Sequence, residues 1–137
     1  MLPSGLPEII AGDEPIAVFL TSSSHYNTTI VKAAAFLPNS KNGEKSVCRH
    51  GAVPPEELQR LSQLFFANSS HVHIHGAGIF SAQVVTINGL TIESEEPPDR
   101  HANIRRWVWS QDDPKMGKAA NLEKAKLLAE KTTLVTW

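Results

Sequence analysis

Residues 54–68 carry the pattern that most restricts how this 137-residue chain can fold. Pro54 and Pro55 precede two glutamates, and leucines and a phenylalanine then recur at spacings of three and four residues. Proline suits the first turn of a helix, and carboxylates there oppose the positive end of the helix dipole. The apolar spacing forms one stripe. We therefore predict an amphipathic helix that ends near Asn68 and needs another element to cover its apolar face.

Short β-branched and apolar segments surround this helix. Asn88-Gly89 separates two of them, which is typical of a two-residue hairpin turn. Gly76 and Gly78 indicate a bulge after a preceding strand. The segments that we expect to be strands are residues 16–20, 28–37, 46–50, 84–87, 90–93 and 104–109. A second helix is expected to begin at Asp112-Asp113-Pro114, with its apolar stripe at Ala119, Leu122, Ala125, Leu128 and Ala129.

The order of these elements is strands, helix, strands, helix. That order predicts an α+β fold: a mainly antiparallel sheet of about five to seven strands, with two helices packed on one face. The chain length is that of a single globular domain, residues 1–137. Residues 1–15 contain three prolines and two glycines. We expect them to be a loosely held lead-in to the domain.

Composition narrows the class of protein. The formal net charge is −1, which argues against a dedicated duplex-DNA binder because such proteins carry a basic excess. Cys48 is the single cysteine, so no internal disulfide forms, and a reducing compartment is favoured. The first fifteen residues do not resemble a secretory signal, and no apolar run approaches the length of a membrane span. A soluble cytoplasmic protein, without a membrane partner, is expected.

Three histidines occupy alternate positions: His71, His73 and His75. On an extended strand their imidazoles would share one side. An H-x-H pair such as His73 and His75 can offer two ligands to one divalent metal, with the third from His50, His101 or a loop carboxylate. The alternative is three half-exposed histidines on a polar sheet face, each bonded to its neighbours.

Two further histidines each follow an arginine, as Arg49-His50 and Arg100-His101. Both pairs fall near predicted strand ends, where side chains are held by a rigid scaffold yet open to solvent. One histidine as base and one as acid, with arginines that clamp an anion, would suffice to cleave a phosphodiester or bind a nucleotide. This interpretation requires His50 and His101 to converge. The alternative is that the arginines pair with the acidic loop at residues 95–99.

The aromatic and thiol side chains also have two interpretations. Trp107 and Trp109, on the same side of a predicted strand, could stack a base. Core packing is the competing role, and it is favoured for at least one of them. Cys48 and His50 could form a thiolate–imidazole pair on one strand face, but a lone cysteine in a strand is more often a small buried hydrophobe.

Residues 33–50, 85–107 and 124–135 contain an Ala-Phe-Leu-Pro segment, a Ser-Val-x-Arg segment and a His-Ala-Asn-Ile-x-x-Trp segment. In these segments the chain resembles short uncharacterised bacterial proteins, a family to which no activity is attached. The resemblance adds weight to Arg49, His50, His101 and Asn103 as positions of interest. It also implies a bacterial protein from a mobile or defence-related gene cluster.

Three functions follow from these patterns. Because every catalytic pattern is incomplete, we favour a non-catalytic binding or accessory module that self-associates or binds a protein partner through exposed strand edges. The second is a histidine- and arginine-dependent phosphodiester hydrolase or nucleotide-binding enzyme, with Asn103, Trp107 and Trp109 as binding residues and a small anion as ligand. The third is a metal-binding domain that uses His73 and His75.

Overall fold

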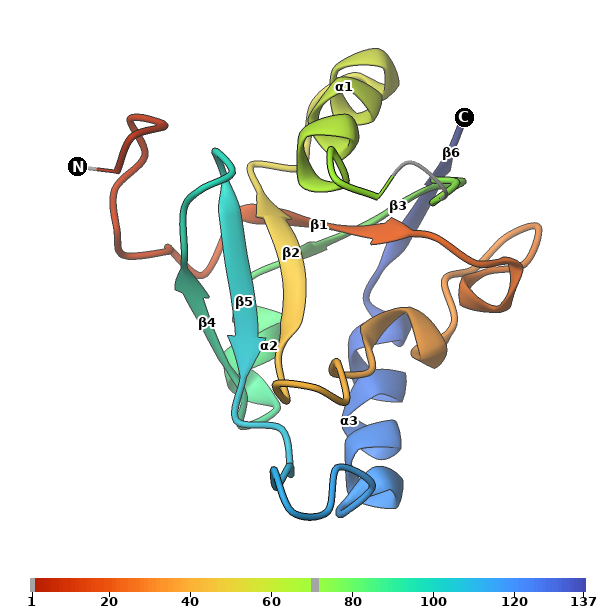
Figure 1. Cartoon of the computed structure of the whole chain (residues 1–137). Coiled ribbons are helices and arrows are strands. Elements are labelled where there is room, and N and C mark those ends of the chain that lie inside the picture. The colour runs from red at the N-terminus through yellow and green to blue at the C-terminus, as the bar shows by residue number, and fades with distance from the viewer. Residues whose placement is uncertain (1, 70–71) are drawn as a thin grey trace.

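The computed structural model describes residues 2–69 and 72–137, which contain six strands and three α-helices (Figure 1). The strands are β1 (Pro15–Leu20), β2 (Lys45–Arg49), β3 (Gly76–Ser81), β4 (Thr91–Ser94), β5 (His101–Arg105) and β6 (Thr133–Thr136). The α-helices are α1 (Pro55–Phe65), α2 (Gln83–Ile87) and α3 (Lys118–Glu130), and two short 3-10 helices are η1 (Ser23–His25) and η2 (Ala33–Phe36).

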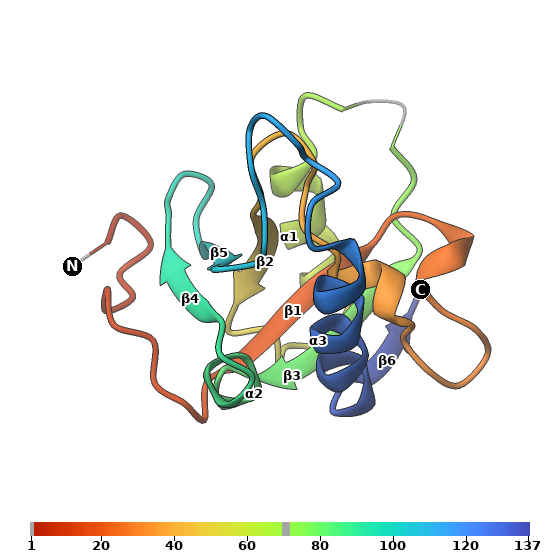
Figure 2. The same ribbon diagram turned by 90° about the horizontal axis from the view of Figure 1, so that it is seen from below.

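The six strands form one sheet in the order β4-β5-β2-β1-β3-β6, and every neighbouring pair is antiparallel. The α+β fold class is therefore confirmed. The prediction that two helices pack on one face is wrong, because the two longer helices lie on opposite faces of the sheet. Helix α1 covers one face, and α3 packs on the other together with η2 (Figure 2).

Helix α1 forms as its sequence predicts, although it ends at Phe65. Leu58 and Leu61 of its apolar stripe are buried against one face of the sheet, which we call the α1 face. The edges of the Phe65 and Phe66 rings meet the ring of Phe19, with centroids 5.2 and 6.4 Å apart. These contacts place the C-terminal end of α1 over β1.

Helix α3 begins at Lys118, six residues after the predicted start. Gly117 precedes it with a φ of 75°, a left-handed conformation that glycine adopts without strain. The Asn121 side chain accepts a hydrogen bond from the Val108 amide and donates one to the Val108 carbonyl, at 2.9 and 2.8 Å. Ala125 and Leu128 of the predicted stripe are fully buried. The hydrogen bonds of Asn121 therefore hold the first turn of α3 against Val108, and apolar packing holds the later turns.

The predicted Asn-Gly hairpin is wrong. Residues 83–87 form α2, and the Asn88 side-chain amide donates to the Val84 carbonyl at 2.7 Å, near the helix end. Gly89 has a φ of 78° and leads into β4. Both a hairpin and a helix end use the left-handed conformation of glycine, so the dipeptide does not distinguish them.

The single strand predicted at residues 28–37 is also wrong. Asn27 accepts hydrogen bonds from the Thr29 and Ile30 amides, both at 2.9 Å, and this side chain turns the backbone. Residues 33–36 then form η2, whose Phe36 packs edge-on against Phe80. Val31, Ala35 and Phe36 are buried, and they cover the face of the sheet on which α3 packs, which we call the α3 face.

Gly76 and Gly78 do not mark a bulge, because both lie in register within β3, opposite Leu20 and Val18 of β1. A side chain at Gly76 would collide with the Val135 carbonyl of β6 at 2.2 Å. Glycine is thus needed for the close approach of two strands. His73 and His75 precede the strand, and His71 lies outside the described residues.

Strand β5 ends at Arg105, so the expected strand to residue 109 is too long. Arg106 has a φ of 74°, which breaks the alternation of side chains. Trp107 then returns to the core, where its indole nitrogen donates to the Ile104 carbonyl at 3.2 Å. Trp109 packs elsewhere, so the two tryptophans do not share a strand face.

The first fifteen residues make specific contacts with the domain. The Ser4 amide donates to Glu96 at 3.0 Å, and the Pro7 carbonyl accepts from the Arg49 guanidinium at 2.5 Å. Glu14 is buried beside the same guanidinium. Within the described part of the chain, no helix is long and apolar enough to cross a bilayer.

Candidate functional site

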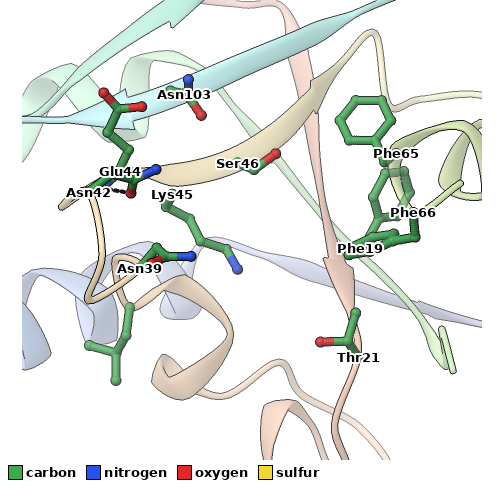
Figure 3. Close-up of a pocket in the computed structure, with 11 residues that line it drawn as sticks. Phe19, Thr21, Asn39, Asn42, Glu44, Lys45, Ser46, Phe65, Phe66 and Asn103 are labelled. Carbon is green, nitrogen blue, oxygen red and sulfur yellow. Dashed lines mark hydrogen bonds between the residues drawn. The ribbon is translucent and has the colours of Figure 1, made fainter. Parts of the chain in front are cut away.

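A pocket of about 290 Å³ opens between the end of α1 and the loop that leads into β2, beyond the last paired residues of β1 and β2 (Figure 3). Aromatic rings form one wall, and amide, hydroxyl and amine groups form the other. Its lining consists of Phe19, Thr21, Leu37, Asn39, Asn42, Glu44, Lys45, Ser46, Phe65, Phe66 and Asn103.

The sheet register explains why residues far apart in the chain meet here. Ser46 of β2 lies opposite Asn103 of β5, so both side chains occupy the same face. Phe19 lies on this face of β1, and Thr21 is two residues further along. Three strands therefore contribute to the floor, over which α1 places Phe65.

The loop over residues 39–44 builds the polar wall. The Asn39 side-chain oxygen accepts from the Lys41 amide at 2.7 Å, and that of Asn42 accepts from the Glu44 amide at 3.0 Å. Gly43 has a φ of 71°, and a side chain there would lie 2.6 Å from the ring of Trp109. Since both asparagine oxygens serve the loop backbone, their NH₂ groups are left as the donors that meet a ligand.

Lys45 is the cation of the pocket. Its amine forms no ion pair with any carboxylate of the described residues, and burial lowers its pKa to about 8. His25 lies nearby: its pKa is lowered by burial first, then by the charge of Lys45 and by His75. The Thr21 amide donates to Nδ1 of His25 at 3.2 Å. The Lys45 amine, which has no carboxylate counterion among the described residues, thus lies near the imidazole of His25.

The opposite rim of the pocket is acidic. The Arg105 guanidinium pairs with three carboxylates: Glu44 at 3.0 Å, Glu93 at 2.5 Å, and Glu95. These contacts raise the pKa of Arg105, and the hydrogen bond that Arg105 donates to Glu93 is the largest cause. One cation shared by three anions leaves a net negative charge along this rim.

His101 lies at the edge of the pocket and contacts Ser46. Its Nε2 is 2.8 Å from Oγ of Ser46, and its Nδ1 is 2.5 Å from the Glu95 carbonyl oxygen. The ring of Phe65 packs edge-on against the imidazole, with centroids 5.5 Å apart. Of the predicted catalytic residues, His101 is the one that contacts a lining residue, Ser46, although it does not itself line the pocket.

His50 and Arg49 lie elsewhere. Arg49 is fully buried and opposite Ile16, which places its side chain on the α3 face. Its guanidinium makes two hydrogen bonds with Glu14, at 2.8 and 2.7 Å, and Nε2 of His50 is 3.3 Å from the same carboxylate. Because His101 contacts α1 on the other face, the predicted convergence of His50 and His101 is not found.

Arg100 also lies outside the pocket. Its φ of 72° is left-handed, and its amide donates to Glu96 at 2.9 Å. Among the described residues, its Nη1 is buried without a hydrogen-bond partner. Cys48 is buried, and burial raises its pKa to about 12, so it is a neutral thiol. The thiolate–imidazole pair of Cys48 and His50 therefore does not form.

The predicted metal ligands His73 and His75 lie beside each other. The rings of His73 and His75 lie edge to face, 4.7 Å apart. Nδ1 of His75 is 2.8 Å from the Tyr26 hydroxyl. Across residues 2–69 and 72–137, no three histidine, cysteine or acidic side chains gather as they would around a metal ion. His71, the third histidine of the pattern, lies outside the described residues.

Of the predicted binding residues, Asn103 lines the pocket, and its NH₂ group donates to Glu95. Trp107 is buried in the core, while Trp109 supports the loop at residues 39–44 through a 3.0 Å bond to the Ser40 carbonyl. Sequence reasoning missed Lys45 and Ser46, which immediately precede the Val-Cys-Arg-His segment. The alternation of polar Ser46 with buried Val47 is a signal that could have found Ser46, and no local pattern marks Lys45.

No protein-family model matches the chain, and no curated protein or solved structure matches it either.

Proposed function

We propose that the protein is a binding module whose pocket holds a small organic anion. The observation that carries this proposal is Lys45, an amine with a lowered pKa and no carboxylate partner in the described chain. A ligand carboxylate would supply the missing countercharge. A charge-assisted hydrogen bond in a partly dry site is worth about 1.5–3 kcal/mol.

The other pocket groups limit the chemistry of this ligand. The NH₂ groups of Asn39 and Asn42 and the hydroxyl of Thr21 are donors, so they favour acceptor oxygens. The three carboxylates around Arg105 disfavour a polyanion such as a nucleoside triphosphate. Phe65, Phe66 and Leu37 offer a surface to an apolar group. These features fit a monocarboxylate with an aromatic or branched aliphatic tail.

Isothermal titration calorimetry with phenylacetate tests the proposal. Phenylacetate should bind about tenfold or more tightly than phenylacetamide, which has the same shape without the charge. Lys45→Met should abolish this preference. Lys41→Met is the matched control, because Lys41 is an exposed lysine of the same loop that does not line the pocket. Equal affinity for the acid and the amide, or an unchanged Lys45→Met, would contradict the proposal.

We also propose that the module self-associates through β6, an edge strand of the sheet. The Trp137 amide donates to the His75 carbonyl at 3.3 Å. Backbone groups alternate along a strand, so those of Leu134 and Thr136 point away from β3 and can pair with another strand. Sedimentation equilibrium should show a dimer that Thr136→Pro dissociates and Thr136→Ala does not. A monomer at every concentration would exclude self-association.

A further inference from the structure

A hydroxyl that lines the pocket lies beside a histidine at its edge. Ser46 on β2 and His101 on β5 are diagonal neighbours, because Ser46 pairs with Asn103 and His101 with Cys48. Both side chains therefore occupy the α1 face, and the Ser46 hydroxyl is 2.8 Å from Nε2 of His101. Ser46 is exposed and lines the pocket, so a ligand can reach its oxygen.

The contacts of His101 assign the direction of this hydrogen bond. Its Nδ1 is 2.5 Å from the Glu95 carbonyl oxygen, which can only accept, so Nδ1 must carry the proton. In the neutral ring, Nε2 then holds the lone pair and accepts the proton of the Ser46 hydroxyl. A serine that donates to a histidine fixed in this tautomer is the ground state of a general-base pair.

Two neighbours support a catalytic geometry. Phe65 packs edge-on against the imidazole and, with the Glu95 carbonyl, holds the ring in one orientation. Lys45 lines the same pocket from the other side of β2, so its charge attracts an anionic ligand to the pocket. His50 has no such arrangement, since it faces the carboxylate of Glu14.

We infer that Ser46 and His101 hydrolyse esters of the carboxylic acid that the pocket binds; this inference rests on the function proposed above. Ser46 Oγ would attack the ester carbonyl carbon as His101 takes the hydroxyl proton. The C–O bond to the alcohol breaks, and the alcohol leaves with that proton. Water, deprotonated by His101, then attacks the acyl carbon; the bond to Ser46 Oγ breaks, and His101 returns the proton to Oγ. The carboxylic acid that forms releases its proton to solvent. The products are the alcohol and a carboxylate, which Lys45 retains until release.

Hydrolysis of p-nitrophenyl phenylacetate tests this inference, with labelling by phenylmethylsulfonyl fluoride as a second measurement. Turnover should fall about 100-fold or more in Ser46→Ala and in His101→Gln, and added imidazole should partly rescue His101→Gln. Mass spectrometry should find the sulfonyl group on Ser46, formed as fluoride leaves. Ser23→Ala, at an exposed serine outside the pocket, is the matched control.

The results separate this inference from the binding proposal. If Ser46 is labelled no faster than Ser23, or equally in His101→Gln, the Ser46–His101 bond is purely structural and the inference is wrong. Binding of phenylacetate by Ser46→Ala would then leave the proposed function standing. Conversely, labelling of Ser46 that depends on His101, without any carboxylate binding, would support the pair and overturn the binding proposal.

Discussion

Burial decides which single residues of this protein are available for chemistry. Cys48 and Lys45 are three positions apart on β2, but desolvation acts on them in opposite directions. It raises the pKa of the Cys48 thiol to about 12 and lowers that of the Lys45 amine to about 8. In both cases burial favours the neutral form over the charged form. The thiol consequently loses its reactive anion, whereas the amine stays close to its titration range at neutral pH.

Cys48 should resist alkylation in the folded protein. At pH 8 the thiolate fraction is very small and the sulfur is buried, so we expect iodoacetamide to react at least about 100-fold more slowly than in denaturant. Mass spectrometry against time measures both rates. Similar rates in the folded and unfolded protein would show that the thiol is accessible.

Removal of one partner from the buried Glu14–Arg49 pair should destabilise the protein strongly. Glu14→Leu leaves the fully buried guanidinium without its carboxylate, and we expect a loss of about 3–5 kcal/mol in the free energy of unfolding. The double variant Glu14→Leu/Arg49→Met should recover much of this loss. Urea denaturation provides the comparison. Additive losses in the double variant would argue against a paired role.

Lys45→Met should stabilise the protein at pH 7, by about 1–3 kcal/mol, because it removes a poorly solvated charge. The lowered pKa means that the unfolded chain binds the Lys45 proton more tightly than the folded chain. Wild-type stability should therefore rise, relative to Lys45→Met, between pH 8 and about 10.5. Chemical denaturation across this range measures the difference. If the difference in unfolding free energy between the wild-type protein and Lys45→Met does not vary with pH, the burial of the Lys45 amine is contradicted.

At the level of elements, sequence patterns correctly predicted the helices and strands that neighbouring residues in the chain are sufficient to specify. Helix α1 follows from its prolines, glutamates and leucine spacing, and β1 and β2 follow from their composition. The predicted hairpin at residues 84–93 and the strand at residues 28–37 depended on signals that two structures share. There, tertiary packing of Val85 and Phe36 in the core selected helical turns instead.

The close approach of β3 and β6 gives a test at this scale. Gly76→Ala would place a methyl carbon 2.2 Å from the Val135 carbonyl oxygen, so the strands must separate. We expect a loss of about 1–3 kcal/mol or more. Gly12→Ala is the control, since its added carbon meets nothing closer than 3.4 Å. Equal thermal stability of Gly76→Ala and Gly12→Ala would mean that β6 can move away from β3 without a loss of stability.

For the whole molecule, the fold class could be predicted but the site could not. The pocket depends on β2 pairing with β5, which places Ser46 beside residues more than fifty positions later. No local pattern encodes that strand order. His73 and His75 of the histidine pattern do not line this pocket. His101 and Asn103 were identified, but without their partner Ser46 or the cation Lys45.

The pH dependence of phenylacetate binding tests the central claim most directly. If the charged Lys45 amine holds the carboxylate, affinity measured by calorimetry should be constant near pH 6.5–7 and fall as the pH rises above 8. Binding near pH 8 should also be accompanied by proton uptake. Lys45→Met should show weak binding without this dependence. Affinity that stays level from pH 6.5 to 9.5 in the wild-type protein would contradict the account.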